Sequence, residues 1–424
     1  PEIIVILLTF KLYMKNYNSA IFFIFLTVLI DIIGMAVIIP VMPTLIEELI
    51  GGDISEASHY GSLLMVSYAI MQFIFSPIMG GLSDKFGRRP VLLLSLLGMC
   101  INYVLLIFAP TFGWLLAGRF LSGISGASLT TANAYIADVS TPEKRTQNFG
   151  LVGVAFGLGF IIGPVIGGVA ADYSSRAPFI VSAAITLLNL LYGIFILPES
   201  LKQENRRDFS WTRSNPFNSI INLRKHPVVS KLAITLFCLY MASYAVQSTW
   251  PYYTKYKFHW NERTIGISLA VVGVLSMLVN GLLIRWTLKK WGNISSILIG
   301  TAFYSLGLVL FAFASEGWMM YLICIPYCLG GIAGPSLQGI MSGQTPPNGQ
   351  GELQGAITGV MSIATVFGPL LMLNLFNHFS GKNAYFEFPG MPYIVGFIFM
   401  IIATAFVIPF LKNTRALQQK EKEI

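Results

Sequence analysis

Residues 80–90 read GGLSDKFGRRP and lie between two long apolar runs. Glycines permit a tight turn and a close approach of helices, and Asp84 and Arg88 place opposite charges on that turn. A loop that only oriented the chain in a membrane would need its basic residues but not its glycines or a carboxylate. The stretch therefore predicts a specific charged turn between two membrane-spanning helices.

The composition of the whole chain is that of a polytopic membrane protein. Of its 424 residues, 55% are hydrophobic and 11% are charged, against roughly 25% charged residues in a typical soluble domain. A bilayer-spanning helix uses about 20 mostly apolar residues, so twelve crossings need about 240. A soluble two-domain protein could not solvate so apolar a surface. A single-pass anchored protein is excluded because the apolar residues are spread along the whole chain.

Twelve apolar runs are each long enough to cross a hydrocarbon core of roughly 30 Å as a helix. They cover residues 19–42, 59–82, 90–110, 112–137, 148–171, 177–197, 229–254, 264–287, 293–315, 317–343, 351–377 and 391–411. The sequence therefore predicts an all-α membrane protein with twelve transmembrane helices. Met14 is the expected start of the protein, and no cleavable signal peptide is expected.

The basic residues predict the orientation of the chain. Of the 27 Lys and Arg residues, 21 lie in the amino end, the tail and the loops after the even-numbered runs, and five lie in the opposite loops. Because cytoplasmic loops carry the excess of Lys and Arg, both termini are expected in the cytoplasm. The net charge of +8 is thus distributed over loops, which argues against a nucleic-acid-binding face.

Internal repetition divides the chain into two halves. GISGASL at 123–129 matches GIAGPSL at 331–337, and GP at 163–164 recurs at 368–369. Parallel halves with a site at their interface near the midplane are typical of transporters. We expect an N-terminal six-helix half at 14–198, a cytoplasmic linker at 199–228, a C-terminal six-helix half at 229–411 and a cytoplasmic tail at 412–424.

Two charged residues lie inside the apolar runs. Arg119 in the fourth run should face protein and have a partner, because an arginine in hydrocarbon costs about 2.5–3.5 kcal/mol or more. Asp31 in the first run is the available partner, since both residues fall at similar depths. Two roles are possible for Asp31. It forms a permanent structural ion pair with Arg119, or it binds and releases a proton during transport.

Residues 80–90 match the signature loop of the major facilitator superfamily, GxLxD(R/K)xG(R/K)(R/K), at every defined position. The resemblance implies a conformational latch on the cytoplasmic side. In it, Arg88 would pair with Asp138 at the end of the fourth span, and Asp84 would lie against the amino end of the eleventh. The residues of this expected latch are Gly80, Asp84, Gly87, Arg88, Arg89 and Asp138.

The fifth run resembles a second motif, GxxxGPxxGG, which marks the twelve-span drug:proton antiporters of this superfamily. Its residues here are Gly159, Gly163, Pro164, Gly167 and Gly168. Small residues four apart allow close helix packing, and generic packing is the alternative role for isolated glycines. The whole motif implies export in exchange for protons, with Asp31 and Arg119 as proton-coupling residues.

The resemblance to the tetracycline-efflux branch runs along nearly the whole chain, through strings such as IDIIGMAVIIPVMPTL, GRFLSGISGA and GELQG. Three positions depart from it. Asn102 and Tyr304 stand where that branch carries Asp, and Ser276 stands where it carries His. A cavity with polar, uncharged and aromatic walls should prefer neutral or weakly cationic amphiphiles, so we expect poor protection against tetracycline.

Polar and aromatic residues within the spans are candidates for binding the substrate. They are Gln72, Asn102, Tyr244, Gln247, Tyr304 and Gln338, with Asn133 and Asn374 as further members. Hydrogen bonding between helices is the alternative role for most of them. Trp250, Tyr252 and Tyr253 are expected in an interfacial aromatic belt, and the four cysteines are expected as small buried residues.

The sequence thus predicts a proton-coupled secondary transporter that exports a small amphipathic molecule or drug by alternating access. A proton symporter or facilitator that imports a nutrient is the first alternative, and a non-transporting receptor or scaffold is the second. No phosphate loop, zinc spacing or nucleophile elbow occurs, so neither enzymatic activity nor a cofactor or metal is expected. The expected partners are a small-molecule substrate, protons and the lipid bilayer of a bacterial inner membrane, and the protein is expected to be monomeric.

Overall fold

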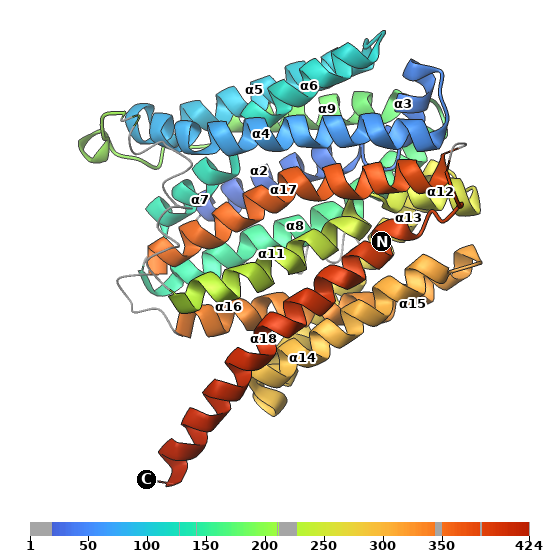
Figure 1. Ribbon diagram of the computed structural model, residues 1–424. Coiled ribbons are helices and arrows are strands. Elements are labelled where there is room, and N and C mark those ends of the chain that lie inside the picture. The colour runs from blue at the N-terminus through green and yellow to red at the C-terminus, as the bar shows by residue number, and fades with distance from the viewer. Residues whose placement is uncertain are drawn as a thin grey trace.

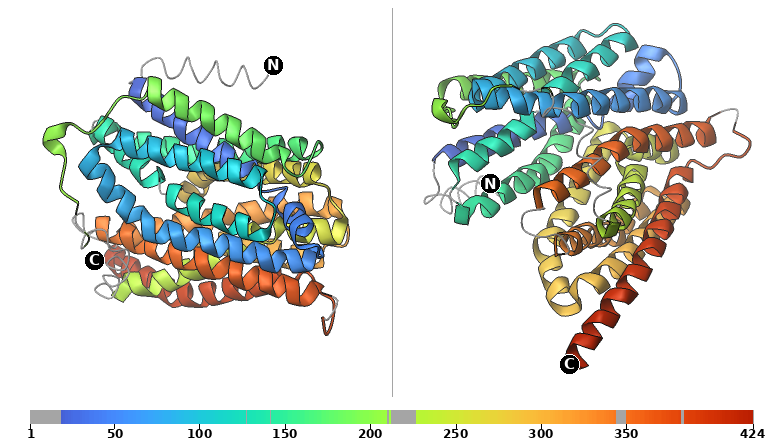
Figure 2. Two further views of the ribbon diagram at one scale, coloured as in Figure 1. Left: turned by 90° about the horizontal axis from the view of Figure 1, so that it is seen from above. Right: turned by 60° about the vertical axis from the view of Figure 1, so that its left-hand side comes forward.

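The computed structural model describes residues 19–126, 128–140, 142–209, 211, 227–343, 350–381 and 384–423 (Figure 1). All regular secondary structure in these ranges is helical. The helices gather into two bundles, coloured blue to green and yellow-green to red, which lie against each other along their length (Figure 2). The predicted linker residues 210 and 212–226 lie outside the described ranges, so the predicted half boundaries stay a prediction.

The N-terminal bundle holds the first six predicted spans. Its helices are α2 (Ser19–Ala36), α3 (Met42–Ile50), α4 (Ile54–Phe86), α5 (Arg88–Ile107), α6 (Phe112–Ser125), α7 (Ser128–Val139), α8 (Pro142–Ala171) and α9 (Ala177–Phe195). A short 3₁₀ turn, Gln203–Asn205, follows α9. Thus each of the first six predicted apolar runs is largely helical in the structure.

The C-terminal bundle repeats this plan. Its elements are α11 (Pro227–Gln247), α12 (Trp250–Phe258), α13 (Glu262–Leu278), a π-helical turn (Val279–Leu283), α14 (Ile284–Phe313), α15 (Gly317–Leu329), a 3₁₀ turn (Gly330–Ile332), α16 (Ala333–Gly343), α17 (Gln350–Ser380) and α18 (Met391–Glu423). A kink at Gly292 divides α14 between the eighth and ninth apolar runs.

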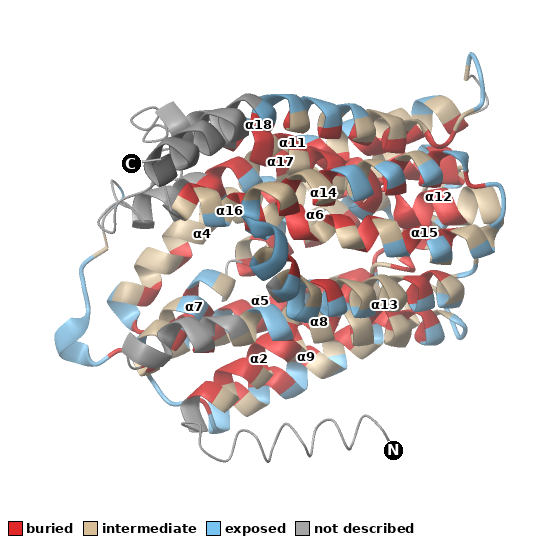
Figure 3. Cartoon of the chain, turned by 90° about the horizontal axis from the view of Figure 1, so that it is seen from below, coloured by how far each residue is buried: buried red, intermediate tan, exposed pale blue. Residues whose placement is uncertain are grey.

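The surface of the protein suits a bilayer. Within the described residues, nine helices are long and apolar enough to cross a membrane, and two shorter apolar helices, Ile21–Ala36 and Ala233–Gln247, accompany them. Large apolar side chains in or next to these helices are exposed, among them Phe108, Leu188 and Phe195. Figure 3 shows exposed positions along many of the helices. An exposed apolar surface of this extent fits contact with lipid and not with water. The chain is therefore a multi-pass membrane protein.

Four of the predicted spans are interrupted where the sequence predicted continuous helices. The first divides into α2 and α3, the fourth into α6 and α7, the seventh into α11 and α12, and the tenth into α15 and α16. Pro43 and Pro251 lie in the first turns of α3 and α12, where a missing backbone N–H costs no hydrogen bond. Each third span thus carries a break, beginning with the first.

The repeated sequence strings lie at matching places in the two bundles. GISGASL includes the last residues of α6 and the first of α7, and GIAGPSL includes the end of the 3₁₀ turn and the start of α16, so both lie at a broken span. Gly87 has φ +104° and Gly292 has φ +71°, and each lies at the turn after the second span of its bundle. L-residues other than glycine rarely adopt such angles, which explains why both turns carry glycine.

Two pairs of long helices join the bundles. The first pair is α4 with α17, and the second is α8 with α13. The α4–α17 pair is linked by polar side chains near the start of α4. Ser55 Oγ donates to Asn377 O at 2.9 Å, and His59 Nδ1 lies 2.6 Å from Asn374 Oδ1. We call this end of the molecule, where α3, the start of α4, α12 and the end of α17 meet, the sealed end.

Candidate functional site

The centre of the site is formed by Asp31 and Arg119 in the N-terminal bundle. Asp31 lies on α2 and is 6% exposed. Tyr68 on α4 and Tyr103 on α5 each interact electrostatically with both Asp31 and Arg119. The two charged residues therefore interact with the same two tyrosines, of which Tyr103 is buried and Tyr68 partly buried. The direct Asp31–Arg119 ion pair stays a prediction.

The Arg119 guanidinium has spare hydrogen-bonding capacity. Its Nε and Nη2 atoms are buried and have no hydrogen-bond partner among the described residues. Buried polar groups are nearly always satisfied by protein, water or a ligand. A buried cationic donor with this capacity can bind water, a proton-carrying carboxylate or a polar group of a transported molecule.

Gln72 and Tyr244 extend the polar centre to the second bundle. Gln72 Nε2 donates to Tyr68 Oη at 3.1 Å. Tyr244 on α11 interacts electrostatically with Tyr68, and its hydroxyl donates to Thr365 Oγ1 on α17 at 2.9 Å. The structure thus brings four of the predicted residues, Asp31, Arg119, Gln72 and Tyr244, into one polar region between the bundles.

Each of the three positions that depart from the tetracycline-efflux pattern packs against a neighbouring helix of its own bundle, Asn102 in the N-terminal bundle and Ser276 and Tyr304 in the C-terminal bundle. Asn102 is 1% exposed, and a Cβ on Gly118 would lie 2.7 Å from its Oδ1. Tyr304 Oη donates to Tyr327 Oη at 3.3 Å, and Ser276 Oγ lies 3.6 Å from Cys328 Sγ. All three therefore act between helices in this structure.

The remaining substrate candidates are spread along the C-terminal bundle and α7. Gln338 on α16 forms a side-chain hydrogen bond with Tyr240 on α11, one turn from Tyr244. Asn374 Nδ2 donates to Leu370 O at 2.6 Å. Gln247 and Asn133 are exposed. Gln338 is therefore next to the polar centre, whereas Gln247 and Asn133 are not buried in it.

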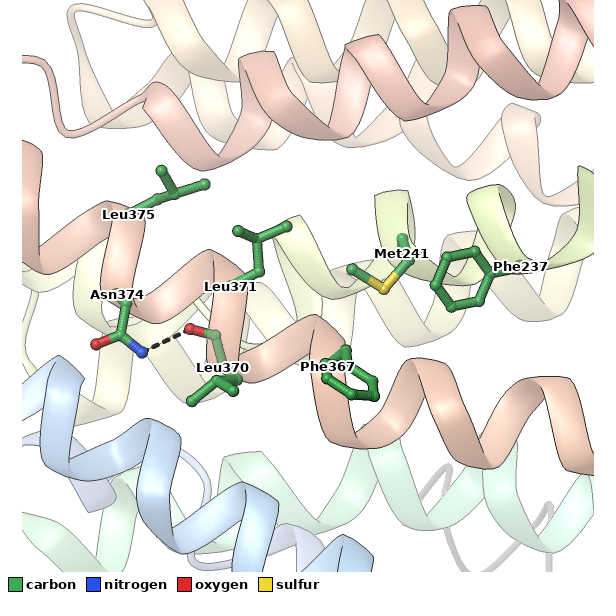
Figure 4. Close-up of a pocket in the computed structure, with 7 residues that line it drawn as sticks. All are labelled: Phe237, Met241, Phe367, Leu370, Leu371, Asn374 and Leu375. Atoms are coloured by element: carbon green, nitrogen blue, oxygen red, sulfur yellow. Dashed lines mark hydrogen bonds between the residues drawn. The ribbon is translucent and has the colours of Figure 1, made fainter. Parts of the chain in front are cut away.

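An apolar cavity of about 620 Å³ lies between α11 and α17 (Figure 4). Its walls are Phe237, Met241, Phe367, Leu370, Leu371, Asn374 and Leu375. Asn374 is the polar member of this set, and its side chain turns back to its own helix in the figure. Such a wall offers dispersion contacts to an apolar group and few hydrogen bonds.

The prediction of an aromatic belt at the start of α12 is wrong. Trp250, Tyr252 and Tyr253 are 1%, 5% and 0% exposed. Trp250 Nε1 donates to Ser268 Oγ at 2.9 Å, and Tyr253 Oη donates to Phe311 O at 2.7 Å. Their position at the end of a span suggested the interface, but the break before α12 turns them into the protein. The four cysteines are buried and free, as predicted.

At the end opposite the sealed end, Arg88 is held by three acceptors. Its Nη1 donates to Asp84 Oδ1 at 2.6 Å and to Ser83 Oγ at 2.7 Å, and its Nε donates to Asp138 Oδ2 at 3.1 Å. Arg88 is 8% exposed, so these bonds form largely out of water. The expected contact with Asp138 is therefore present, whereas its function as a latch stays a prediction.

Glu199 is a member of this cluster that the sequence analysis missed. Its carboxylate accepts from the backbone N–H groups of Arg88 at 2.9 Å and Arg89 at 3.2 Å, which are the first of α5. A carboxylate at a helix amino end is favoured by the helix dipole. A Cβ on Gly87 would overlap this carboxylate. Gly87 therefore has two roles: it adopts the positive φ of the turn, and it leaves room for the Glu199 carboxylate at the start of α5.

Two further residues of the expected latch, Gly80 and Arg89, take no part in the hydrogen bonds of the Arg88 side chain. Gly80 has open space around its Cα, and Arg89 Nη2 donates to Ile194 O at 2.5 Å. The expected contact of Asp84 with the eleventh span falls on side chains 350–356, which lie outside the described part of the chain. That contact stays a prediction.

Replacing Arg88 with Gln is expected to remove most uphill transport. The substitution removes the cation that joins Asp84 to Asp138, and each hydrogen bond to a charged group is worth about 1.5–3 kcal/mol. Transport and cysteine labelling at this end of the cavity measure the effect. Lys85→Gln is the control, because Lys85 is exposed and its ammonium lies over the neighbouring Phe86 ring. Unchanged flux and labelling in Arg88→Gln would show that the loop only orients the chain.

The glycines of the fifth-span motif pack against both bundles. A Cβ on Gly159 would lie 2.5 Å from Ile32 Cγ2, and a Cβ on Gly163 would lie 2.5 Å from Ala36 Cβ, so one face of α8 contacts α2 beside Asp31. A Cβ on Gly168 would lie 2.7 Å from Glu262 O, so another face contacts α13. Pro164 O lies on that second face, against Gly266.

Comparison with known proteins identifies the family. The model of the Major Facilitator Superfamily matches residues 24–369 and again 232–423. The chain belongs to the Major Facilitator Superfamily. Twelve spans are implied by that fold, in agreement with the six predicted spans of each bundle, and superfamily members are transporters, not enzymes.

Several relatives are similar to this chain over most of their length. The class C tetracycline resistance protein of Escherichia coli is 40% identical over 359 residues, which cover 85% of this chain and 90% of the relative. The class B protein of Escherichia coli is 36% identical over 395 residues, 93% of this chain and 96% of the relative. The bovine hippocampus abundant transcript-like protein 1 is 27% identical over 362 residues, 80% of this chain and 72% of the relative.

Solved structures share the fold at lower identity. The nucleoside transporter NupG has a TM-score of 0.74 at 12% identity, with 93% of this chain and 99% of that chain covered. The human organic anion transporter MFSD10 (TETRAN) has a TM-score of 0.65 at 21% identity, with 90% and 98% covered. These likenesses support the superfamily fold alone.

Proposed function

We propose that this protein is a proton-coupled exporter of small amphipathic molecules or drugs that works by alternating access. The observation that carries the proposal is the polar centre, where buried Asp31 and Arg119 share Tyr68 and Tyr103 between the two bundles. An intramembrane carboxylate beside a cation is suited to bind and release a proton. The similarity to tetracycline resistance proteins over most of the chain supports export.

The proposal includes the placement of the chain in the membrane. We infer that both termini and the Arg88 cluster face the cytoplasm of a bacterium and that the sealed end faces outward. The excess of Lys and Arg in the loops on one side supports this orientation. In this orientation the inter-bundle hydrogen bonds of Ser55 and His59 lie at the outer end of the protein.

The walls of the site support an amphipathic substrate. The polar centre supplies hydroxyl, amide and guanidinium groups, and the α11–α17 cavity supplies an apolar surface. A molecule with one polar end and an apolar body matches both regions. Uphill uptake of a drug panel into inverted vesicles, with and without a pH gradient, tests the proposal. If the uptake of every drug in the panel is the same with and without the pH gradient, proton coupling is refuted.

Expression in a pump-deficient bacterium is expected to protect poorly against tetracycline. A drug that carries a chelated divalent cation is best met by several carboxylates, and Asn102 and Tyr304 offer none at the two positions concerned. Minimum inhibitory concentrations measure the effect, with the Asp31→Asn variant as the inactive control. Strong resistance that is lost in Asp31→Asn would contradict this prediction and identify tetracycline as a substrate.

A further inference from the structure

A row of buried polar side chains runs along α9 on the side that faces α2. Ser182, Thr186 and Asn189 are four and three residues apart, so they share one face of the helix. Their exposed fractions are 0%, 1% and 0%. Ser182 Oγ donates to Gly34 O at 2.9 Å, and Asn189 Nδ2 donates to Thr27 O at 2.9 Å. Because α9 packs against α2, α5 and α8, this row lies inside the N-terminal bundle.

Asp31 lies between the two points at which this row touches α2. Thr27, Asp31 and Gly34 are four and three residues apart on α2, so they share one face of that helix. Asn189 contacts this face at Thr27, and a Cβ on Gly34 would lie 3.1 Å from Thr186 Oγ1. The polar row on α9 therefore passes alongside α2 at the depth of Asp31.

Two polar atoms of the row have no hydrogen-bond partner among the residues that the structure describes. They are Thr186 Oγ1 and Asn189 Oδ1, and both are buried. The Tyr103 hydroxyl of α5 approaches the same place, since a Cβ on Gly34 would lie 3.5 Å from it. A buried water typically makes about three hydrogen bonds to polar groups of this kind. Glycine at position 34 keeps the place clear of a methyl group, so the three groups can bind a water molecule.

The polar row continues toward the end of the bundle opposite the sealed end. Tyr192 follows Asn189 by three residues on α9, and its buried Oη also lacks a hydrogen-bond partner within the described ranges. Its ring packs edge-on against Phe23, near the start of α2, at a centroid distance of 5.9 Å. Beyond it, Ile194 O accepts from Arg89 Nη2, so α9 ends beside the start of α5. A further polar group is thus available one turn from Asn189.

We propose that Thr186, Asn189 and Tyr103 hold a water molecule beside Asp31, and that Asp31 exchanges its proton through this water inside the N-terminal bundle. The inference rests on the proposed proton-coupled export. The protonated Asp31 carboxyl gives its proton to the water and becomes a carboxylate. The hydronium then passes the proton toward the cytoplasmic end and is water again, and uptake of a proton is the reverse. Thr186 and Asn189 are positioning residues, since they act on Asp31 through the water.

X-ray footprinting with mass spectrometry on purified full-length protein tests the water site without a drug. Radicals formed from bound water label the side chains next to it, so labelling of Tyr103, which is 1% exposed, reports on internal water. Thr186→Val removes the hydroxyl at nearly constant shape. It should lower this labelling about fivefold, the change in a binding equilibrium when one hydrogen bond of typical strength is lost. Gly34→Ala places a methyl group against the same hydroxyls and should lower it at least as far.

The matched control is Thr27→Val, which makes the same substitution in the same pair of helices. Thr27 is 3% exposed, but its Oγ1 donates to Phe23 O of its own helix, so the water does not depend on it. This variant should keep the labelling of Tyr103, and so should Thr186→Ser, which retains a hydroxyl. Equal labelling of Tyr103 in wild type and in Thr186→Val would overturn the proposal, whether or not Gly34→Ala folds.

The transport assay tells a failure of this inference from a failure of the proposed function. Uphill drug uptake into inverted vesicles should fall about fivefold in Thr186→Val, in proportion to the bound water, and recover in Thr186→Ser. Downhill equilibration of the same drug should stay at the wild-type rate. Lowered labelling with full uphill uptake would overturn the proposal, because the water would then serve packing alone.

Two further outcomes separate the water site from the exporter. Proton-dependent uptake by the wild type, with labelling of Tyr103 unchanged in Thr186→Val, would refute the water site and retain the exporter. Lowered labelling in Thr186→Val, with uptake by the wild type that does not depend on protons, would refute the exporter and with it the exchange of a proton through this water.

Discussion

Asp31→Asn is expected to abolish uphill transport while the protein still reaches the membrane and still equilibrates its substrate downhill. An amide has nearly the shape of a carboxyl group but cannot bind and release a proton near neutral pH. Asp31 lies twelve residues into α2, about 18 Å along the helix, which places it well inside the hydrocarbon core. Loss of its proton cycle removes the energy source for accumulation, so drug uptake into acidified inverted vesicles should fall to the background level.

A matched substitution shows whether the effect belongs to the polar centre. Asp172→Asn removes a carboxylate from the same bundle, but Asp172 lies at the sealed end, where it pairs with Arg263 at 3.6 Å in a solvent-exposed position. Surface pairs of this kind contribute about 0–1 kcal/mol, so this variant should transport normally. Accumulation by Asp31→Asn at the wild-type rate would exclude Asp31 as the coupling residue.

Gly167→Ala is expected to cause the second large effect, a loss of folded protein. A Cβ at this position would overlap the carbonyl oxygen of Val37, the residue directly after α2. Val37 O belongs to the backbone, which cannot turn aside as a side chain can, so α2 and α8 must separate. Overpacking lowers the free energy of unfolding by about 1–3 kcal/mol in ordinary cores. Because the obstacle here is backbone, we expect Gly167→Ala to lower it by at least the larger of these values.

The same helix provides the control for this substitution. Gly153 lies on α8 with open space around its Cα. Alanine is more favourable than glycine inside a helix by about 1 kcal/mol, and this gain applies equally to both substitutions. Gly153→Ala has the gain without a clash, so it should leave the stability unchanged or raise it. Thermal unfolding in detergent and the fraction of monodisperse protein compare the two variants. Equal stability of Gly167→Ala and wild type would show that α2 and α8 do not pack as closely as described.

The apolar runs and the glycine-rich motifs were sufficient to predict the fold. Long hydrophobic stretches have one stable form in lipid, so their positions predict the helices. The Gly87 turn was equally predictable, because the glycine and the neighbouring charges are close in sequence. The breaks within four spans were not predicted, since Gly and Pro interrupt or merely kink a helix according to what packs beside them.

The site was predictable only where its members share a motif. Asp31 and Arg119 stand out because charges are rare in spans. Tyr68 and Tyr103 did not stand out, because a tyrosine in an apolar helix is unremarkable until the helices around it are placed. Glu199 was missed for the same reason, since its backbone partners in α5 are 110 residues or more away in the chain.

The interrupted spans give the transport cycle a step that rigid rocking alone would not provide. A helix with a break can bend there at low cost, so α2 and α11 can tilt while α3 and α12 stay packed at the sealed end. Both ends of the cavity can then be shut at the same moment around a bound molecule. In this occluded intermediate, drug inside the protein should not exchange with drug in the medium on either side of the membrane.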